Sequence, residues 1–362
     1  MARITVQASR TYEILVDEQP LESLGYLAKT VTNASKALVI SDANVAPLYA
    51  DSAIRSLAEA GIPSSLFSFP AGEASKTLST YASCLDACCE AGLSRNDVII
   101  ALGGGVVGDV AGFTAATYMR GCSCIQVPTS LLACVDSSVG GKTAVDLPAG
   151  KNLVGAFFQP NAVLIDTSVL STLDPHFFVD GCAEIIKYGA IADAELLAEL
   201  SEPLKPEDSR LPAIIQRCVS IKRDIVSADE HETGIRQLLN FGHTLGHAIE
   251  RLSSFSVTHG FAVACGMALA ANGGSALGIT SDEARHAIFS ALDHANLTTS
   301  LGDCGLQSIT AHDIYLAALS DKKRFADSMH VILATTPGHA EIVPMKLPVF
   351  EQFVASSLWK ER

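Results

Sequence analysis

The first 170 residues alternate short apolar segments with helix-like segments, and this alternation constrains the fold more than any other feature of the chain. Strands are predicted at residues 36–40, 65–69, 97–102 and 122–127, and helices at residues 45–60 and 77–91. Strands that lack a polar face are typical of parallel sheets whose two faces are both covered by helices. The alternation therefore predicts an α/β domain built on a parallel sheet.

The pattern changes after about residue 172. Strand-like runs become rare there, and helical periods dominate at residues 181–200, 211–228, 236–252 and 261–277. A chain of 362 residues is also longer than one hydrophobic core usually serves. We therefore expect two domains, residues 1–170 with the sheet and residues 171–362 mainly α-helical, with the boundary between Thr167 and Pro175.

The composition restricts the class of protein. Apolar residues make up 48% and charged residues 18%, which excludes a disordered chain. The net charge of −14 argues against nucleic acid or an anionic membrane as the main partner. The N-terminus has no signal-peptide layout, so we expect a cytoplasmic protein, with an organelle matrix as the alternative. In such a compartment the ten cysteines are expected to be buried, reduced thiols and not disulfides.

A glycine turn joins a predicted strand to a predicted helix. The apolar run 98–102 leads into Gly103-Gly-Gly-Val-Val-Gly-Asp109, and a helix is predicted at Val110–Met119. Glycines allow close approach to the backbone, and a helix N-terminus offers unpaired N–H groups, so the segment favours a diphosphate cradle. In the usual dinucleotide fold this motif follows the first strand, whereas here it follows about the third. A tight structural turn is the alternative interpretation.

A second glycine-rich segment carries lysines. Residues 136–143 resemble the end of a P-loop, but Asp136 stands where that motif requires its first glycine, so a P-loop nucleotide triphosphatase is excluded. Lys142 and Lys151, with Asn152, remain in a polar, glycine-rich stretch of an acidic chain. They indicate a bound anion, and the alternative is that they are solvated surface lysines.

Four polar residues share one stripe of a predicted helix. Arg236, Asn240, His243 and His247 are spaced i, i+4, i+7 and i+11. Two histidines one turn apart are a common metal-binding arrangement, although a lone pair of this kind is often structural. His259, at the start of the next predicted helix, offers a third imidazole.

A catalytic zinc site commonly has three protein ligands and one open position. Glu184, on a separate predicted helix with Lys187 one turn further on, is one source of a carboxylate ligand. The acidic cluster at residues 229–232 is a competing source, although such charged loops are normally solvated.

Together these segments resemble the 3-dehydroquinate synthases, a family of sugar-phosphate cyclases. The resemblance runs from about residue 14 to residue 342 and is strongest at residues 103–113, 128–143, 150–160, 183–191, 239–250 and 321–323. It implies a Rossmann-like NAD-binding domain followed by an α-helical metal- and substrate-binding domain, in a homodimeric enzyme of the shikimate pathway.

The resemblance also implies a role for individual residues. Glu184, His243 and His259 would bind the metal, Zn²⁺ or Co²⁺, while His247 would stay free for acid–base catalysis. Further catalytic residues would be Lys142, Lys187, Lys222, Asn240 and Glu232. The substrate would meet Asp136, Asn152, Arg236 and one of Lys322 or Lys323, with Arg120 reaching its phosphate across a dimer interface. NAD would contact Asp42, Glu73, Lys76, Gly105, Val106, Val107, Gly108, Asp109, Thr129, Ser130, Lys142, Lys151, Val169, Leu170, Ser171 and Thr172.

The implied reaction explains why an acidic chain holds so many candidate anion-binding cations. Its substrate would be 3-deoxy-arabino-heptulosonate 7-phosphate, which is oxidised transiently by NAD⁺, loses phosphate by β-elimination, is reduced again and closes into 3-dehydroquinate by an aldol step. One departure from the family pattern stands beside the third ligand, where Phe261 replaces the usual glutamate of His-Gly-Glu. Carboxylates near a ligating imidazole tune metal affinity, so metal affinity or turnover is altered unless another group takes over.

Three other functions compete with this one. A sibling cyclase that makes an inosose or a valiolone would share the metal and cofactor segments, but Asn152, Arg236 and Asn240 favour 3-dehydroquinate synthase. A metal-dependent polyol dehydrogenase would need no set of phosphate-binding cations. A non-catalytic metal-binding paralogue is disfavoured because every proposed acid–base and anion-binding position is occupied by a suitable residue.

Overall fold

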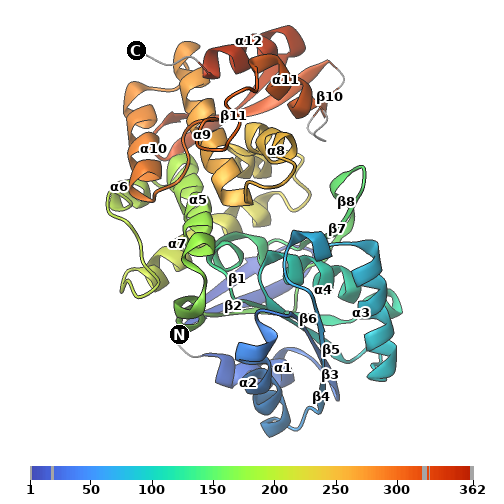
Figure 1. Ribbon diagram of the computed structural model, residues 1–362. Coiled ribbons are helices and arrows are strands. Elements are labelled where there is room, and N and C mark those ends of the chain that lie inside the picture. Colours follow the sequence, from blue (N-terminus) through green and yellow to red (C-terminus); the bar gives the residue numbers. More distant parts are fainter. Residues whose placement is uncertain (1, 18–19, 320–323, 326, 359–362) are drawn as a thin grey trace. The chain divides into compact units, whose positions relative to one another are not determined.

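The computed structural model describes residues 2–17, 20–319, 324–325 and 327–358 (Figure 1). The chain forms two compact units. Unit 1 comprises Met1–Asp174 and Ser209–His231, and unit 2 comprises Pro175–Asp208 and Glu232–Arg362. Within the described residues, no helix is long and apolar enough to cross a membrane. All ten cysteines lie in the described part of the chain and are free thiols, and all but Cys89 are buried.

Unit 1 is built on a seven-stranded sheet with the order β1-β2-β9-β6-β5-β3-β4. Its strands are β1 (Ala2–Gln7), β2 (Thr11–Asp17), β3 (Ala37–Asp42), β4 (Ser64–Phe69), β5 (Val98–Gly103), β6 (Ser123–Pro128) and β9 (Ala162–Asp166). Only the β1–β2 pair is antiparallel, and every residue of β5 and β9 is buried. The predicted fold class, a parallel-rich α/β domain followed by a mainly helical part, is confirmed.

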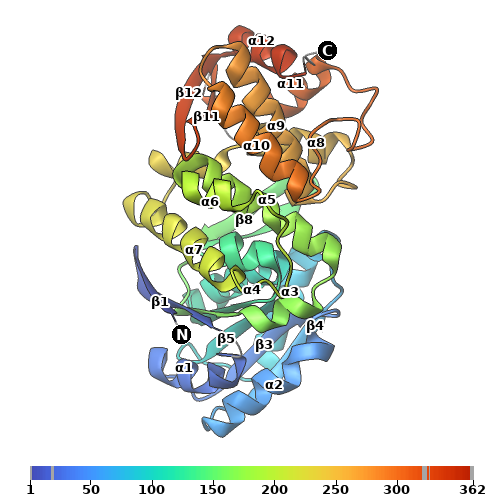
Figure 2. The same cartoon turned by 90° about the vertical axis from the view of Figure 1, so that its left-hand side faces the viewer.

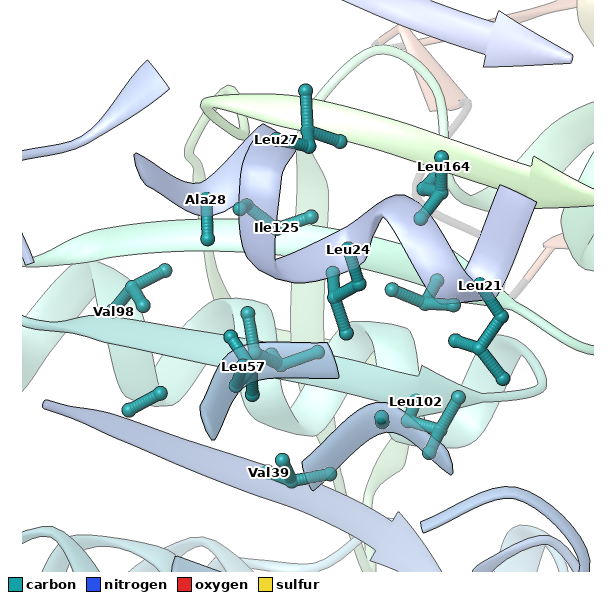
Figure 3. Packing of buried hydrophobic residues seen from close by; sticks show 14 of the residues in the cluster. Leu21, Leu24, Leu27, Ala28, Val39, Leu57, Val98, Leu102, Ile125 and Leu164 are labelled. Atoms are coloured by element: carbon teal, nitrogen blue, oxygen red, sulfur yellow. The ribbon is translucent and has the colours of Figure 1, made fainter. Parts of the chain in front are cut away.

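Helices cover both faces of this sheet. Helices α1 (Leu24–Val31) and α2 (Ala46–Glu59) pack on one face, and α3 (Leu78–Glu90) and α4 (Gly105–Thr117) on the other. Because successive strand residues point to opposite faces, Val39 and Leu102 belong to the first core, whereas Leu38 and Ala101 belong to the second. Figure 3 shows the first core, in which Leu24 and Leu57 lie among the strand residues.

The segment Ser209–His231 returns to unit 1, although we expected all residues beyond 170 to form the second domain. Its helix α7 (Leu211–Ala228) packs against β1 (Figure 2). The Gln7 N–H donates to Ser227 Oγ at 3.3 Å, and the Ser9 N–H and Oγ–H donate to the Glu230 carboxylate at 2.7 and 2.6 Å. These contacts bring α7 to the sheet edge, which a helical sequence pattern does not reveal.

Unit 2 gathers around α9 (His259–Ala276), which contacts α5 (Pro175–Ala192), α8 (His243–Leu252), α10 (Asp282–His294) and α12 (Leu347–Ser357). Helices α6 (Ala194–Glu199) and α11 (Ala311–Leu319) also belong to this unit. A small antiparallel sheet of β10 (Arg324–Phe325), β11 (Ser328–Thr336) and β12 (His339–Lys346) was not expected from the sequence. A further antiparallel hairpin, β7 (Lys142–Leu147) and β8 (Gly150–Phe157), belongs to unit 1.

Asp97 ties the start of β5 to neighbouring loops. Its carboxylate accepts hydrogen bonds from the N–H groups of Ser35, Lys36 and Ser94 at 2.9, 2.8 and 2.7 Å. Burial raises the pKa of Asp97, but these hydrogen bonds outweigh burial and lower the pKa to about 2. The charged carboxylate therefore stabilises the fold fully above about pH 4, and this contribution is lost as the pH falls through 2.

Replacing Asp97 by Asn should lower the free energy of unfolding at pH 7 by about 2 kcal/mol, because the charged acceptor of three backbone N–H groups is lost. Urea unfolding followed by circular dichroism measures the change, with the exposed Asp86→Asn as the matched control. The difference between wild type and Asp97→Asn should shrink between about pH 4 and pH 2. An Asp97→Asn variant as stable as Asp86→Asn at pH 7 would contradict the prediction.

Candidate active site

The glycine turn is shorter than the sequence indicated, because α4 begins at Gly105 and not at Val110. Gly104 is extended and precedes the helix, so residues 105–109 form its first turn. The first N–H groups of a helix have no partner within it, so those of Gly105 to Val107 are the donors that an anion would meet. A Cβ atom on Gly105 would lie 3.2 Å from Ser137 Oγ, which shows how closely backbone and neighbours approach here.

A second glycine, Gly108, lies where α4 meets the sheet. A Cβ atom on Gly108 would lie 2.9 Å from Gln126 Oε1, and Gln126 Nε2 donates to the Gly108 carbonyl at 3.0 Å. The helix therefore packs directly on β6, with its N-terminus at the carboxyl ends of β5 and β6. This is the position where parallel α/β sheets usually bind nucleotides.

A network of charged side chains adjoins the first turn of α4. Lys76 Nζ lies 2.5 Å from Asp109 Oδ2, and Lys151 Nζ lies 3.4 Å from Glu73 Oε1. Burial lowers the pKa of Lys76, but Asp109 and Glu73 outweigh it and hold this pKa above its ordinary value. The structure thus brings together four residues that the sequence analysis assigned to the cofactor.

The other expected cofactor residues follow strand ends of the same sheet. Asp42 ends β3 and its Oδ1 accepts from the N–H groups of residues 44 and 45 at 2.8 and 3.0 Å, while Thr129 and Ser130 follow β6. Residues 169–172 lie in the 3₁₀ helix η5 (Thr167–Thr172) after β9. The side chains of Val107, Val169 and Leu170 are buried in the core, so any cofactor contact from these three would come from the backbone.

Residues expected to bind the substrate or to act in catalysis also lie in unit 1. Lys222, on α7, reaches Asp136 and lies 2.8 Å from its Oδ1 and 2.6 Å from its carbonyl oxygen. Asn152 has a left-handed backbone with φ of 54°, and its N–H donates to Asp146 Oδ1 at 2.7 Å. Lys142 begins β7 and is exposed. Arg120 is exposed too, with a positive φ of 64°.

In unit 2, the predicted helix 236–252 is broken, so the expectation of a single four-residue stripe was wrong. A 3₁₀ helix, η6 (Ile235–Asn240), ends at Asn240, and α8 begins only at His243. Gly242 between them has a positive φ of 77°, and a Cβ atom there would lie 2.5 Å from Met267 Cγ on α9. The close approach of α9 therefore explains both the break and the need for glycine.

Three helices bring the expected metal ligands together. Glu184 lies on α5, His243 begins α8 and His259 begins α9. The Nε2 atoms of His243 and His259 lie 3.5 and 3.4 Å from Glu184 Oε1, and the three ligand atoms are all within 4.8 Å of one another. Glu184 and His243 are buried and His259 is partly buried. One carboxylate and two imidazoles form a donor set that suits a divalent ion such as Zn²⁺.

The surroundings orient these donors. His243 Nδ1 lies 3.1 Å from the Phe241 carbonyl oxygen, which can only accept, so Nδ1 carries the proton and Nε2 keeps its lone pair. The Glu184 carboxylate is fully buried and its Oε2 forms an ion pair with Lys187 on the same helix. Burial lowers the pKa of His259, but hydrogen bonds to Glu184 and Glu250 raise it to about 10, so the site favours a cation.

Two buried carboxylates that the sequence analysis did not single out act on His259 and its helix. Glu250, on α8, lies 3.4 Å from His259 Nδ1 through its Oε1. Asp180, on α5, accepts through Oδ1 from Thr258 Oγ1 at 2.5 Å and from the Gly260 N–H at 2.8 Å. The sequence could have identified Glu250 by its position seven residues after His243, because this spacing places both side chains on one face of a helix.

Phe261, which replaces the glutamate of the family pattern, packs on an aromatic neighbour. Its ring is stacked on His176, with centroids 4.7 Å apart and planes 9° apart. Its N–H lies 3.2 Å from Asp180 Oδ1, among the donors at the start of α9. The side chain thus has a packing role in unit 2.

The remaining expected residues of unit 2 are buried or partly buried. Arg236 and Lys187 are each 1% exposed, and Asn240 Nδ2 donates to Glu232 Oε1.

His247, the expected acid–base residue, lies near two of the expected metal ligands. The centroid of its ring is 5.5 Å from that of His243 and 6.2 Å from that of His259. A second group, His247, Glu250 and His259, also has its ligand atoms within 4.8 Å. Lys322 and Lys323 lie outside the described residues.

Comparisons with known proteins identify the family of this chain. The family pattern described as 3-dehydroquinate synthase N-terminal matches residues 66–180, and the one described as 3-dehydroquinate synthase C-terminal matches residues 181–324. The 3-dehydroquinate synthase of Vibrio atlanticus is 43% identical over 349 residues, which cover 95% of each chain.

Two solved structures share the fold. The structure of 2-deoxy-scyllo-inosose synthase complexed with carbaglucose-6-phosphate, NAD⁺ and Co²⁺ is 28% identical, with a TM-score of 0.86 and coverage of 98% of this chain and 99% of that chain. The 2-epi-5-epi-valiolone synthase of Streptomyces hygroscopicus, solved with NAD⁺ and Zn²⁺, is 24% identical, with a TM-score of 0.86 and coverage of 99% and 98%, and shows the fold alone. On the strength of the two family patterns and the 43% identical relative, this chain belongs to the 3-dehydroquinate synthase family.

Proposed function

We propose that the chain converts 3-deoxy-arabino-heptulosonate 7-phosphate to 3-dehydroquinate and phosphate, using NAD and a divalent metal ion. The observation that carries the proposal is the group of buried Glu184, buried His243 and partly buried His259, in a chain 43% identical to a 3-dehydroquinate synthase along almost its whole length. Buried Lys187 and Arg236 in the same unit add the cations that a phosphorylated acid requires.

We propose that NAD binds at the first turn of α4, with the charged network of Lys76, Asp109, Glu73 and Lys151 beside it. The related 2-deoxy-scyllo-inosose synthase was solved with NAD⁺ and Co²⁺. The free N–H groups at the start of α4 suit the diphosphate. The carboxylate and two imidazoles of unit 2 suit Co²⁺ or Zn²⁺, with Glu184, His243 and His259 as ligands.

When bound, NAD⁺ takes up and later returns a hydride, and the divalent ion polarises the hydroxyl that is oxidised. His247 is one turn from His243 on α8 and is the proposed acceptor of the hydroxyl proton. Arg236 and Lys187 bind the anionic groups of the substrate from buried positions, where their charge acts with little screening. Asn240 holds the Glu232 carboxylate and keeps both groups in place for the substrate.

The rival functions are less well supported. A cyclase of the inosose or valiolone type shares the fold at 24–28% identity, well below the 43% identity to a 3-dehydroquinate synthase. A polyol dehydrogenase would produce NADH from a simple alcohol and has no use for Arg236 and the lysines. Two further points stay predictions: a homodimer in which Arg120 reaches the phosphate of the neighbouring subunit, and a cytoplasmic location. Measuring the mass of the protein in solution tests whether it is a dimer.

The activity itself is tested by incubating the metal-loaded protein with the heptulosonate phosphate and catalytic amounts of NAD⁺. We expect release of inorganic phosphate in large excess over NAD⁺, without accumulation of NADH, because the hydride is returned in each cycle. Phosphate is measured colorimetrically and NADH by its absorbance. Stoichiometric NADH without phosphate release would refute the proposal in favour of a dehydrogenase.

The ligand assignment predicts a separation between metal binding and turnover. Glu184→Gln should weaken Zn²⁺ binding by more than the 10- to 100-fold typical of groups that only support a ligand. His247→Gln should keep the metal but lower kcat by about 10²- to 10⁴-fold, as expected for loss of a general base. Metal content by mass spectrometry and steady-state kinetics measure the two effects. Loss of the metal in His247→Gln, with retention in Glu184→Gln, would reverse the assignment.

Arg236 should matter for the substrate and not for the cofactor. Arg236→Met should weaken substrate binding by about 10- to 100-fold, because a charged hydrogen-bond donor to an anion is lost. NAD⁺ affinity should stay within about threefold of wild type, on calorimetric titration of both ligands, because this affinity rests on unit 1. Arg251→Met, at an exposed position on α8, is the matched control. Equal losses for both ligands would contradict the assignment.

A further inference from the structure

His259 faces a carboxylate at each of its two ring nitrogens. Nε2 lies 3.4 Å from Glu184 Oε1, and Nδ1 lies 3.4 Å from Glu250 Oε1. Glu250 is 2% exposed, so its charge is shielded little by solvent. The geometry is that of an imidazole whose outer nitrogen is held by a carboxylate while its inner nitrogen is presented to a cation.

Glu250 is placed for this role by α8 itself. His243, His247 and Glu250 are spaced i, i+4 and i+7, so all three project from one face of the helix. The helix thus supplies one expected ligand at its first residue and a carboxylate for the other ligand two turns later. The residue before His259 is held as well, since the Thr258 side chain donates through Oγ1 to Asp180 Oδ1 on α5.

Residue 261 cannot serve His259 in the same way. Residues 259 and 261 are two positions apart on α9, which separates their side chains by about 200° around the helix. The stacking of Phe261 on His176 agrees with this separation. The loss of a carboxylate at position 261 therefore does not remove the contact between His259 Nδ1 and the Glu250 carboxylate.

We propose that Glu250 is a positioning residue for the metal: it holds the Nδ1–H of His259, fixes the tautomer with Nε2 free, and raises the basicity of the ligating nitrogen. The inference rests on the metal site of the proposed function. Glu250 is not a ligand in this arrangement, although its carboxylate belongs to the second candidate group with His247.

Two substitutions separate the charge of Glu250 from its hydrogen bond. Glu250→Gln keeps an acceptor of the same shape and removes the charge, whereas Glu250→Ala removes both. Zn²⁺ affinity is measured by competition with a chromophoric chelator, on protein shown by circular dichroism to be folded. We expect Glu250→Gln to bind Zn²⁺ about 10- to 100-fold more weakly than wild type, and Glu250→Ala at least as weakly. Glu283→Gln, an exposed position in the same unit, is the matched control and should bind as wild type does.

A spectroscopic readout distinguishes positioning from general loss of structure. With Co²⁺ as the probe, Glu250→Gln should still bind a single ion, with its visible absorption bands shifted because the ligating imidazole is less basic and less fixed. Zn²⁺ affinity and Co²⁺ bands identical to wild type in Glu250→Gln would overturn the proposal. Complete loss of the ion in Glu250→Gln, with retention in Glu184→Gln, would also overturn it, because Glu250 would then be the ligand.

The same titrations keep this inference apart from the proposed function. If wild type itself binds neither Zn²⁺ nor Co²⁺, the metal site of the proposed function fails and the positioning role falls with it. If wild type binds the metal and Glu250→Gln binds it equally well, only the positioning role fails and the proposed function stands.

Discussion

The buried carboxylate of Glu184 is the constraint on which the arrangement of unit 2 depends. It is fully buried, and removing an ionised carboxylate from water costs several kcal/mol unless charged or hydrogen-bonding partners compensate. Lys187 compensates from the same helix, and His243 and His259 approach from α8 and α9. Three helices therefore converge on one side chain, and a divalent ion placed among these donors would complete the compensation.

This convergence requires helices that approach more closely than side chains normally allow. A Cβ atom on Gly266 of α9 would lie 2.1 Å from the carbonyl oxygen of Gly242, and one on Gly260 would lie 1.9 Å from the carbonyl oxygen of Asp180. Glycines at these positions let α9 touch both α8 and α5, which brings His243, Glu184 and His259 together. Such departures from ordinary helix sequences are expected where a site must be held in one geometry.

In unit 1, charged side chains and backbone N–H groups gather in a similar way at the start of α4. The ion pair of buried Lys76 and partly buried Asp109 sits beside N–H groups that the helix leaves without partners. Gly108 lets the helix lie against Gln126 of β6, so these donors are presented at the carboxyl ends of the strands. The proposed reaction uses both kinds of site, a nucleotide cradle for transient oxidation and a metal centre with buried cations for a phosphorylated acid.

The sequence by itself determined the parallel-rich α/β class and the helices near residues 211–228 and 261–277, because apolar periodicity and glycine turns are local signals. For both sites it supplied candidate residues, which remain predictions. From the residues alone, the carboxylate ligand stayed open between Glu184 and the cluster at 229–232. Only the tertiary structure decided that Glu184 faces His243 and His259, that Glu250 faces His259 Nδ1, and that α7 returns to the sheet of unit 1. The tertiary structure also showed that the predicted helix 236–252 is interrupted at Gly242. The sequence did not indicate this interruption, because the apolar period continues across Gly242. The physical reason is the same in each case: burial, close backbone approach and a positive φ are set by contacts between distant segments, which a linear pattern does not record.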